Sequence, residues 1–255
     1  MAGLWLALGG FEVARAKLNV FVVGYPKSGT LWLARLLGDA LNSPITTTTP
    51  EYVNGLPTEG AGRQGPCFVR HGHALPDRHM ELFYVAGDKI VYIVRDPRDV
   101  VVSSMFYWKY NTIRESVAHV VACKEAGGIS AHVTKWQAHP KVTVYTSYEA
   151  LREDTRCELL RILRALEIVP VNALDVVVQR QSFEQRKAWT MSHGDELVFG
   201  KEVQLQYLRK GIVGDWRNHF TYEDGLLMQE RLGDLMLALG YVEPGECWWE
   251  GLPHE

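Results

Sequence analysis

The stretch that decides the fold is Val20-Phe21-Val22-Val23-Gly24-Tyr25-Pro26-Lys27-Ser28-Gly29-Thr30-Leu31-Trp32. Its apolar, β-branched beginning predicts a strand, and the glycines and proline that follow predict a tight loop. Beyond the loop, apolar residues recur at the three- and four-residue spacing of a helix. A loop that enters a helix N-terminus presents N–H groups that suit an anion. We therefore expect an anion-binding loop, with a positive charge from Lys27 and hydroxyls from Ser28 and Thr30.

The spacing of Gly24 and Gly29 matches the P-loop of nucleotide-binding proteins, whose pattern is GxxxxGK[ST]. In that pattern a lysine directly follows the second glycine, whereas here Thr30 follows it and the lysine lies inside the loop. A nucleotide kinase with a variant P-loop stays an alternative. It would need Mg²⁺ and a lysine at a place where this loop has none.

Size and charge limit the class of protein. The chain has 255 residues, 47% of them hydrophobic, which is enough for one sizeable α/β domain over residues 1–255. Its formal net charge of −3 gives no overall positive field for nucleic acid. We therefore expect no nucleic-acid partner and an anion site that is built locally.

Neither a membrane segment nor an oxidising compartment is indicated by the sequence. No stretch approaches the ~18 apolar residues of a membrane span. Residues 1–10 are apolar but lack the basic start of a signal peptide, and we expect 1–17 to be an N-terminal extension. The cysteines lack metal-ligand or CxxC spacing, which favours reduced thiols and a cytoplasmic protein; they are Cys67, Cys123, Cys157 and Cys247.

Strand and helix patterns alternate along the chain, which predicts a central parallel sheet flanked by helices. Strands are predicted over 67–70, 89–94 and 142–145, and helices within 114–137 (broken at Gly127-Gly128) and over 149–168, 172–179 and 222–239. Two segments, 44–66 and 190–200, lack a clear period. We expect them to be loops that shape the acceptor side of a site, with ordinary flexible loops as the alternative.

Two histidines follow the first of those strands, in Arg70-His71-Gly72-His73. The end of a strand is where α/β folds place ligands, and histidine titrates near neutral pH, so a general base is expected here. A metal site is less favoured, because no Cys, Asp or Glu lies nearby at ligand spacing. Purely structural histidines stay the alternative.

A second charged segment begins where the strand 89–94 ends. Asp96-Pro97 predicts the cap and first residue of a helix. Arg95 then stands at the strand end and Ser103 about two helical turns further on, so that both can face one phosphate. The alternative is that the arginines only pair with nearby aspartates, Arg95 and Arg98 with Asp96 and Asp99.

The third segment, 209–221, has adjacent cations, glycines and aromatic residues but no helix or strand period. Arg209 and Lys210 can bind a doubly charged phosphate, and Gly211 lets a backbone N–H approach it closely. A solvated basic turn is the alternative. Thr221 is expected to cap the last helix.

These segments together resemble the domain of cytosolic-type sulfotransferases, which use 3′-phosphoadenosine 5′-phosphosulfate (PAPS). Tyr25-Pro26-Lys27-Ser28-Gly29-Thr30-x-Trp32 is similar to the family's 5′-phosphosulfate loop. Arg95 with Ser103, and Arg209-Lys210-Gly211-x-x-Gly214-Asp215-Trp216, are similar to its 3′-phosphate site. The segments follow the family's order, and the resemblance covers about residues 18–221.

The resemblance implies a single P-loop-kinase-like α/β domain that moves a sulfuryl group from PAPS to a hydroxyl or amine of a small molecule. The product would be adenosine 3′,5′-bisphosphate, and no metal would be required. His73 would be the catalytic base and Lys27 would stabilise the leaving group. The implied donor site consists of Lys27, Ser28, Gly29, Thr30, Trp32, Arg95, Ser103, Tyr148, Ser182, Phe183, Arg209, Lys210 and Gly211.

The sequence departs from the family pattern at three places. His71-Gly72-His73 stands where the family has Lys-Thr-His, so either His71 or Arg70 would replace its lysine. Leu31 removes one hydroxyl from the loop. The family's dimer motif is degenerate over 217–226, which leaves the oligomeric state open.

The acceptor is not identified by the sequence. Aromatic residues that could line an apolar pocket for a phenol or lipid alcohol are Tyr52, Phe83, Phe106, Tyr107 and Trp108, with plain core packing as the alternative. A PAPS-binding protein without catalytic activity is a further alternative, because the His71-Gly72-His73 segment departs from the pattern.

Overall fold

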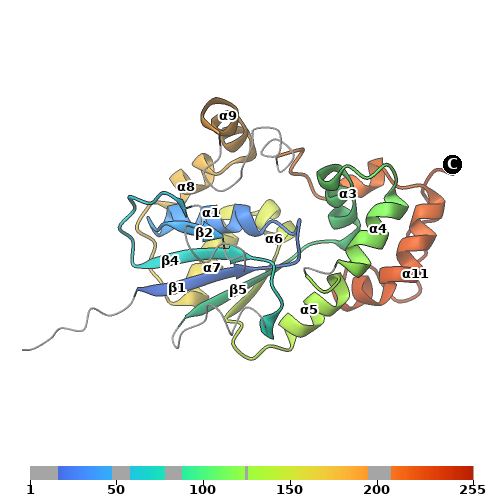
Figure 1. Cartoon of the computed structure of the whole chain (residues 1–255), viewed down its shortest axis with the longest axis horizontal. Helices are drawn as coiled ribbons and strands as arrows, with labels where there is room; N and C mark the ends of the chain where they lie inside the picture. The colour runs from blue at the N-terminus through green and yellow to red at the C-terminus, as the bar shows by residue number, and fades with distance from the viewer. Residues whose placement is uncertain (1–16, 48–57, 78–87, 124–125, 195–207, 255) are drawn as a thin grey trace, which may run out of the picture.

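A computed structural model describes residues 17–47, 58–77, 88–123, 126–194 and 208–254 (Figure 1). The strands of these residues form one six-stranded sheet in the order β3-β2-β4-β1-β5-β6. They are β1 (Leu18–Val23), β2 (Ile45–Thr47), β3 (Thr58–Glu59), β4 (Cys67–Gly72), β5 (Lys89–Val94) and β6 (Val144–Ser147). All neighbours pair in parallel except β2 and β3.

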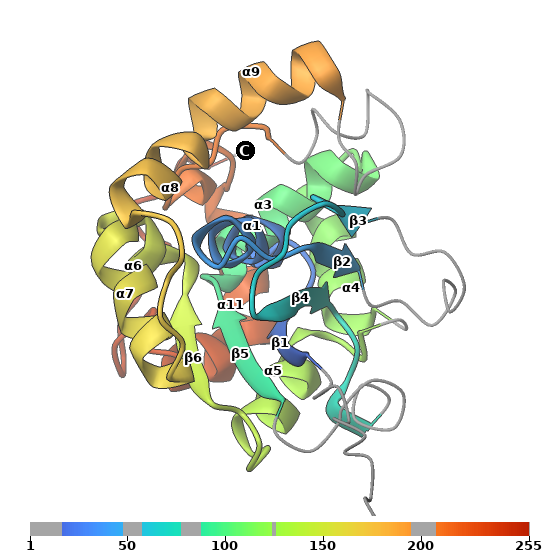
Figure 2. The same cartoon turned by 90° about the vertical axis from the view of Figure 1, so that its left-hand side faces the viewer.

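Helices surround this sheet (Figure 2). They are α1 (Thr30–Ala40), α3 (Pro97–Trp108), α4 (Ile113–Ala122), α5 (Ile129–Gln137), α6 (Tyr148–Glu153), α7 (Thr155–Leu166), α8 (Leu174–Arg180), α9 (Phe183–His193), the short 3₁₀ helix η1 (Asp215–Asn218) and α11 (Tyr222–Ala238). The prediction of an α/β domain with a mostly parallel central sheet is confirmed.

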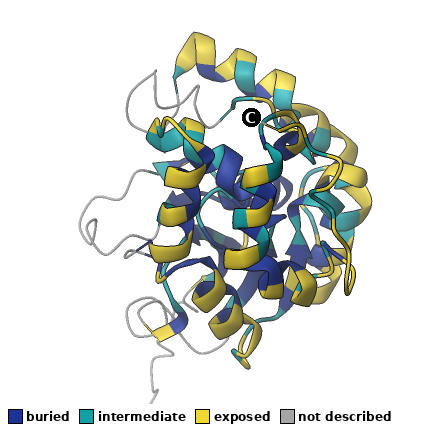
Figure 3. Cartoon of the chain, turned by 90° about the vertical axis from the view of Figure 1, so that its right-hand side faces the viewer, coloured by how far each residue is buried: buried dark blue, intermediate teal, exposed yellow. Residues whose placement is uncertain are grey.

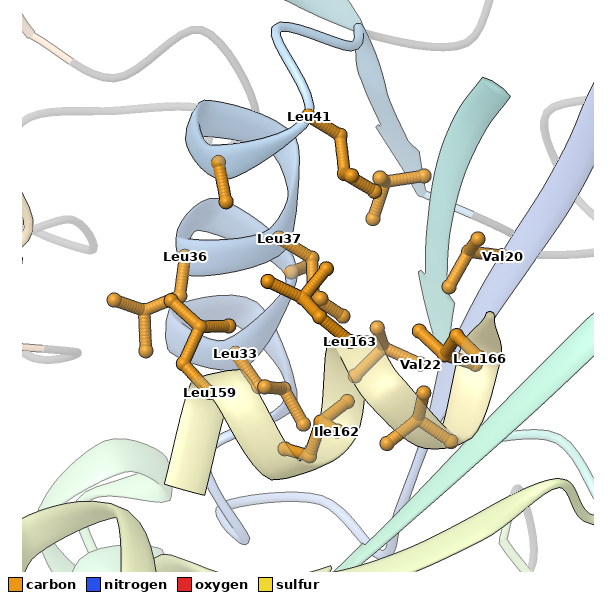
Figure 4. Packing of buried hydrophobic residues seen from close by; sticks show 14 of the residues in the cluster. Val20, Val22, Leu33, Leu36, Leu37, Leu41, Leu159, Ile162, Leu163 and Leu166 are labelled. Carbon is orange, nitrogen blue, oxygen red and sulfur yellow. The ribbon is translucent and has the colours of Figure 1, made fainter. Parts of the chain in front are cut away.

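One face of the sheet packs against α1 and α7. Side chains that point to this face alternate along β1, because successive strand residues face opposite sides. Val20 and Val22 meet Leu33 and Leu37 of α1 and Leu163 of α7, all buried (Figure 4). Burying each such side chain is worth roughly 1.5–3 kcal/mol relative to exposure. This packing fixes the position of α1 behind the loop that precedes it.

The other face of the sheet packs against α5. Phe21 and Val23 of β1 and Tyr92 of β5 form a small cluster with Trp136, which is fully buried. A larger cluster joins α3, α4 and α11, which lie together on the right of Figure 1, beyond the end of β5. Figure 3 shows this side of the molecule, where the helices expose their outer faces and bury their inner ones.

The direction in which successive strands are added to the sheet reverses between β1 and β5. These strands are neighbours in the sheet, with Val23 opposite Tyr92. The chain leaves β1 through α1, on one face, and reaches β6 from β5 through α5, on the other. Ligands of parallel α/β sheets bind at such a point, at the carboxyl ends of the strands.

Several boundaries differ from the predicted ones. Residues 44–66 are not all loop, because they contain β2 and β3. The helix expected over 149–168 is two helices, since the Asp154 side chain accepts a hydrogen bond from Cys157 N and caps a new helix there. Residues 190–193 end α9 instead of belonging to a loop, and most of 194–200 lies outside the described residues.

Candidate functional site

The loop between β1 and α1 passes close to β5 and ends in an open helix N-terminus. A Cβ on Gly24 would lie 2.5 Å from Ile93 O, and one on Gly29 would lie 2.7 Å from Tyr148 Cδ2. Lys27 (φ 72°) and Gly29 (φ 93°) both adopt the left-handed conformation. No side chain caps α1, and its first turn holds no acidic residue. Its N–H groups are therefore suited to an external anion.

Lys27 is half-buried in this loop, and its Nζ is buried against Tyr107 of α3. Its Nζ is 3.9 Å from the centroid of the Tyr107 ring. Burial, and then the positive charge of Arg95, lower the pKa of Lys27 to about 7. An anion in the loop would reverse this effect, because an opposite charge favours the protonated amine.

Arg95, at the end of β5, contacts both the loop that holds Lys27 and the segment 209–221. Its Nη1 donates to Lys27 O at 3.2 Å, and its Nη2 donates to Ile212 O at 3.3 Å. The guanidinium also lies 4.2 Å from the Tyr148 ring centroid. Its Nε is buried and has no hydrogen-bond partner among the described residues, so one donor is left for a ligand.

Aspartates tie the same segments together, so the pairing that was left open as an alternative is present. Arg95 Nη2 is 3.6 Å from Asp99, and Arg98 pairs with Asp96 at 2.8 Å. Asp99 accepts bonds from the backbone N–H groups of Gly214 at 2.8 Å and Trp216 at 3.0 Å. Burial raises the pKa of Asp99. Arg98 is structural, but Arg95 contacts the loop as well as Asp99.

Arg209 and Lys210 share one carboxylate, that of Asp215. Arg209 donates to one oxygen, and Lys210 Nζ donates to the other at 2.9 Å. Burial of Asp215 raises its pKa, but hydrogen bonds from Asn218, Lys210 and Arg209 outweigh this effect and lower the pKa overall. Sequence reasoning gave no role to Asp215, although an acidic residue next to a basic pair was a visible signal.

The residues expected near an adenine ring also come together. Trp32 and Tyr148 lie edge to face, with ring centroids 5.6 Å apart, and Trp32 Nε1 donates to Gln181 O at 3.0 Å. Ser182 caps α9 by accepting a bond from Gln185 N. A Cβ on Gly211 (φ 66°) would lie 2.6 Å from Phe183 Cδ2, so loop 209–214 touches the start of α9.

Three predicted donor-site residues are not part of these contacts: Ser28 and Thr30, which are buried at the loop and at the start of α1, and Ser103. Ser103 is half-buried on α3. Across the described residues, no hydrogen bond or ion pair links it to Arg95, Arg209 or Lys210. Its assignment to the 3′-phosphate site therefore stays a prediction.

His73 follows the end of β4 beside the loop. Its Nδ1 lies 2.8 Å from Gly24 O. A carbonyl oxygen can only accept, so Nδ1 carries the proton and Nε2 has a lone pair. Burial and then Lys27 lower the pKa of His73, against the raising effect of the Gly24 bond. The imidazole is therefore neutral at neutral pH and can accept a proton.

His71 and Arg70 do not supply a second cation beside His73. His71 lies within β4, not past its end as predicted, and its Nε2 is hydrogen-bonded to Thr47 Oγ1 at 2.9 Å. Burial, then His73 and Arg35, lower the pKa of His71 to about 3, which keeps it neutral. Arg70 points to the opposite face of the strand. Its Nε donates to Asn19 Oδ1 at 2.8 Å.

The aromatic residues of α3 lie against cations and other rings. Tyr107 covers Lys27, Phe106 lies 4.4 Å from the Arg209 guanidinium, and Trp108 packs on His119. These contacts place Phe106 and Tyr107 beside the predicted donor site. Tyr52 and Phe83, which were also expected to line an acceptor pocket, lie outside the described residues.

The described ranges contain neither a cluster of metal ligands nor a helix that could span a membrane. His, Cys, Asp and Glu side chains of these ranges nowhere gather in threes that could hold a metal ion. Every helix described is too short or too polar to cross a bilayer.

Known proteins similar to this chain are sulfotransferases. The family model described as "Sulfotransferase domain" matches residues 17–240. Human (Homo sapiens) "Sulfotransferase 2A1" is 28% identical over 85% of this chain and 85% of that protein. The "Amine sulfotransferase" of Oryctolagus cuniculus is 26% identical over 86% of this chain and 82% of that protein.

A solved structure is similar over the same range. The "Crystal structure of mouse sulfotransferase SULT7A1 complexed with PAP" has a TM-score of 0.65 and 25% identity, covering 89% of each chain. The family match spans β1 through α11 and includes the open loop, Arg95 and Arg209-Lys210. The chain is a sulfotransferase and belongs to the sulfotransferase domain family.

Proposed function

We propose which residues of this PAPS-dependent sulfotransferase bind PAPS and which carry out the transfer of its sulfuryl group. Lys27, Ser28, Gly29 and Thr30 bind the 5′-phosphosulfate end of PAPS at the N-terminus of α1. Arg209, Lys210 and Gly211, with Arg95 and Ser103, bind its 3′-phosphate, and Trp32, Tyr148, Ser182 and Phe183 contact the adenine. The observation that carries this assignment is Arg95, which donates to Lys27 O and to Ile212 O and so brings the two phosphate-binding loops together.

The charges of the site fit the two ends of such a nucleotide. The N-terminus of α1 has neither a cap nor an acidic residue, and it faces the loop that holds Lys27. Two cations lie on the other loop, and charge-assisted bonds of this kind are the strong ones. No pocket for a divalent cation is needed in this scheme, because Lys27 and backbone N–H groups meet the anion.

The chemical step uses His73 and Lys27. His73 Nε2 takes the proton of the acceptor hydroxyl as that oxygen forms a bond to sulfur. The bond between sulfur and the bridging phosphate oxygen breaks, and Lys27 stabilises the negative charge on that oxygen. Preorganised charges that stabilise a developing anion are worth several kcal/mol, about 3 for a single donor.

The acceptor is proposed to be a small molecule with a hydroxyl or amine group. It would reach His73 from the side of β2 and β3, which belong to the predicted acceptor segment 44–66; residues 48–57 of that segment and 195–200 of the segment 190–200 lie outside the described residues. None of the four cysteines, all within the described residues, forms a disulfide, in keeping with the proposed cytoplasmic location. The oligomeric state stays open.

The test is transfer of labelled sulfate from PAPS to a panel of phenols, alkyl alcohols and amines. His73→Asn should lower kcat on the order of 10²-fold or more. It should leave the affinity for adenosine 3′,5′-bisphosphate nearly unchanged, because His73 is bonded to the backbone carbonyl of Gly24 and is not one of the proposed phosphate ligands. Wild-type binding of the nucleotide without transfer to any acceptor would favour the non-catalytic alternative.

The kinase alternative is tested by a different ligand. Adenosine 3′,5′-bisphosphate should raise the melting temperature more than ATP with Mg²⁺ does, because only the former has a phosphate for Arg209 and Lys210. Arg209→Met with Lys210→Met should remove most of that difference. A larger shift with ATP would contradict the proposed donor.

A further inference from the structure

The backbone that carries His73 is held from α5. His132 Nε2 lies 3.1 Å from His73 O, and Trp136 Nε1 donates to Ala74 O at 3.0 Å. His132 and Trp136 are fully buried and lie one helical turn apart. Two successive carbonyl groups after β4 are therefore fixed by one face of α5.

The hydrogen bonds of His132 determine which of its nitrogens carries the proton. The His73 carbonyl can only accept, so Nε2 is the donor. Nδ1 then accepts from Tyr92 Oη, which lies 2.9 Å away. Burial and then His73 lower the pKa of His132 to about 3, so the ring stays neutral. Both ring nitrogens are thus used, and the orientation of the ring is defined.

His132 also touches the loop that holds Lys27. Its ring meets Tyr25 edge-on, with centroids 5.8 Å apart and planes at 81°. Tyr25 belongs to that loop, and its hydroxyl donates to Val120 O of α4 at 2.9 Å. On the other side the His132 ring stacks on Tyr92 at 5.8 Å. One side chain therefore contacts both the loop of Lys27 and the backbone of His73.

We propose that His132 is a positioning residue for sulfuryl transfer, which fixes His73 relative to the loop that holds Lys27. The inference rests on the proposed role of His73. The base and the leaving-group cation lie on different strand ends, so their separation depends on what bridges them. A displacement of about 1 Å in such a pair can cost up to 10²-fold in rate.

Two substitutions of His132 separate positioning from packing. His132→Gln keeps an amide donor near the place of Nε2, whereas the shorter His132→Asn places its amide near that of Nδ1, where it can accept from Tyr92 but does not reach His73 O. We expect His132→Asn to lower kcat about 10- to 100-fold with KM for PAPS changed less than about threefold. His132→Gln should stay within about fivefold of wild type, which is a rescue by the longer amide.

Two further variants show how far a loss of stability alone lowers the rate. Ser116→Ala removes a buried bond to Val101 O at 2.7 Å, in α4 and away from the site, and should lower the melting temperature without lowering kcat. Trp136→Phe removes the bond to Ala74 O and should give a smaller loss of kcat than His132→Asn. All rates are measured at a temperature where circular dichroism shows each variant folded.

These outcomes test the positioning role of His132 separately from the proposed role of His73 as the base. Equal kcat values for His132→Asn and His132→Gln, or losses that follow melting temperature across all variants, would overturn the positioning role. If His132→Asn is inactive because it does not fold, the comparison of Trp136→Phe with Ser116→Ala at matched stability decides. Full activity of His73→Asn would instead remove the proposed base, whatever the His132 variants do.

Discussion

The β1–α1 and β5–α3 junctions lie side by side in the sheet but differ at the helix N-terminus. At α3, Asp96 caps the helix and Asp99 lies in the first turn. At α1, no side chain caps the helix and no acidic residue follows. Both junctions run from a buried parallel strand into a helix at the same edge. The difference therefore comes from side chains and not from topology.

This difference separates stability from binding. Carboxylates at a helix N-terminus satisfy its N–H groups and complement its dipole, so they stabilise the fold. At the α3 junction, Asp96 and Asp99 supply these carboxylates, and they also pair with Arg98 and Arg95. The α1 junction leaves the same groups for a ligand, and it adds a lysine with positive φ. The α1 junction, where the chain omits its own anion, is the proposed site for the 5′-phosphosulfate.

The largest effect is expected from Lys27, the cation of the open junction. Lys27→Met keeps the length of the side chain but removes the charge, and should lower kcat by a factor of ~10²–10³. Lys89→Met, which removes a half-buried lysine paired with the exposed Glu167, serves as the control and should have wild-type rates. Labelled-sulfate transfer measures both; a loss under about fivefold for Lys27→Met would mean that the open junction does not act on the leaving group.

At the capped α3 junction, a substitution should lower stability instead of activity. Asp96→Ala removes the cap of α3 and leaves Arg98 buried without its carboxylate, so the free energy of unfolding should fall by about 3 kcal/mol. The Kd for adenosine 3′,5′-bisphosphate should change little once the protein is folded. Urea unfolding and calorimetry measure the two quantities. A large loss of affinity with unchanged stability would reverse the distinction between the junctions.

Gly29 tests how closely the open junction is packed. Gly29→Ala would force a Cβ to within 2.7 Å of Tyr148 at a φ of 93°, and should lower the free energy of unfolding by about 2 kcal/mol. Gly245→Ala is the matched control, because Gly245 has a φ of 78° and no atom within 4 Å of its Cβ. It should lose only about 1 kcal/mol. Equal losses would show that the contact with Tyr148 contributes nothing.

The smallest effect is a proton taken up on binding. The pKa of Lys27 is lowered to about 7 while the site holds no anion, and a bound phosphate raises it. Binding of adenosine 3′,5′-bisphosphate should therefore take up close to one proton at about pH 8 and much less at about pH 6, where Lys27 is already charged. Calorimetry in buffers of different ionisation enthalpy measures this uptake. The Lys27→Met variant should abolish it; uptake that persists would belong to His73.

Much of the fold could be predicted because its signals are local. Lys89–Val94 is an unbroken apolar run, and β5 has those bounds. Thr221 caps α11 with Asp224 in the reciprocal capping box, as expected from neighbouring residues. By contrast, β2 and β3 are short strands at the edge of the sheet. The pairing of β2 with β4 and of β3 with β2 defines them more than their own sequence does.

The residues of the candidate site also divide into those that the sequence reveals and those that only the fold brings together. The loop of Lys27 and the pair Arg209-Lys210 are continuous in sequence and could be found from it. Asp215 lies within six residues of the two cations that it holds, so it could have been assigned as well. His132 could not be assigned, because its role depends on what the fold brings near it. For His132 the partners are Tyr92 and His73, on two different strands or strand ends, and no spacing along the chain encodes that meeting.

Asp215 has one further consequence for selectivity. By holding Arg209 and Lys210 in place, it removes in advance much of the rotational freedom that two long side chains would lose when a nucleotide arrives. An incoming group must also compete with a carboxylate for these donors. A dianionic phosphate succeeds in that competition more readily than a hydroxyl or a singly charged ester. In the proposed donor site, the loop would thus select its ligands by charge.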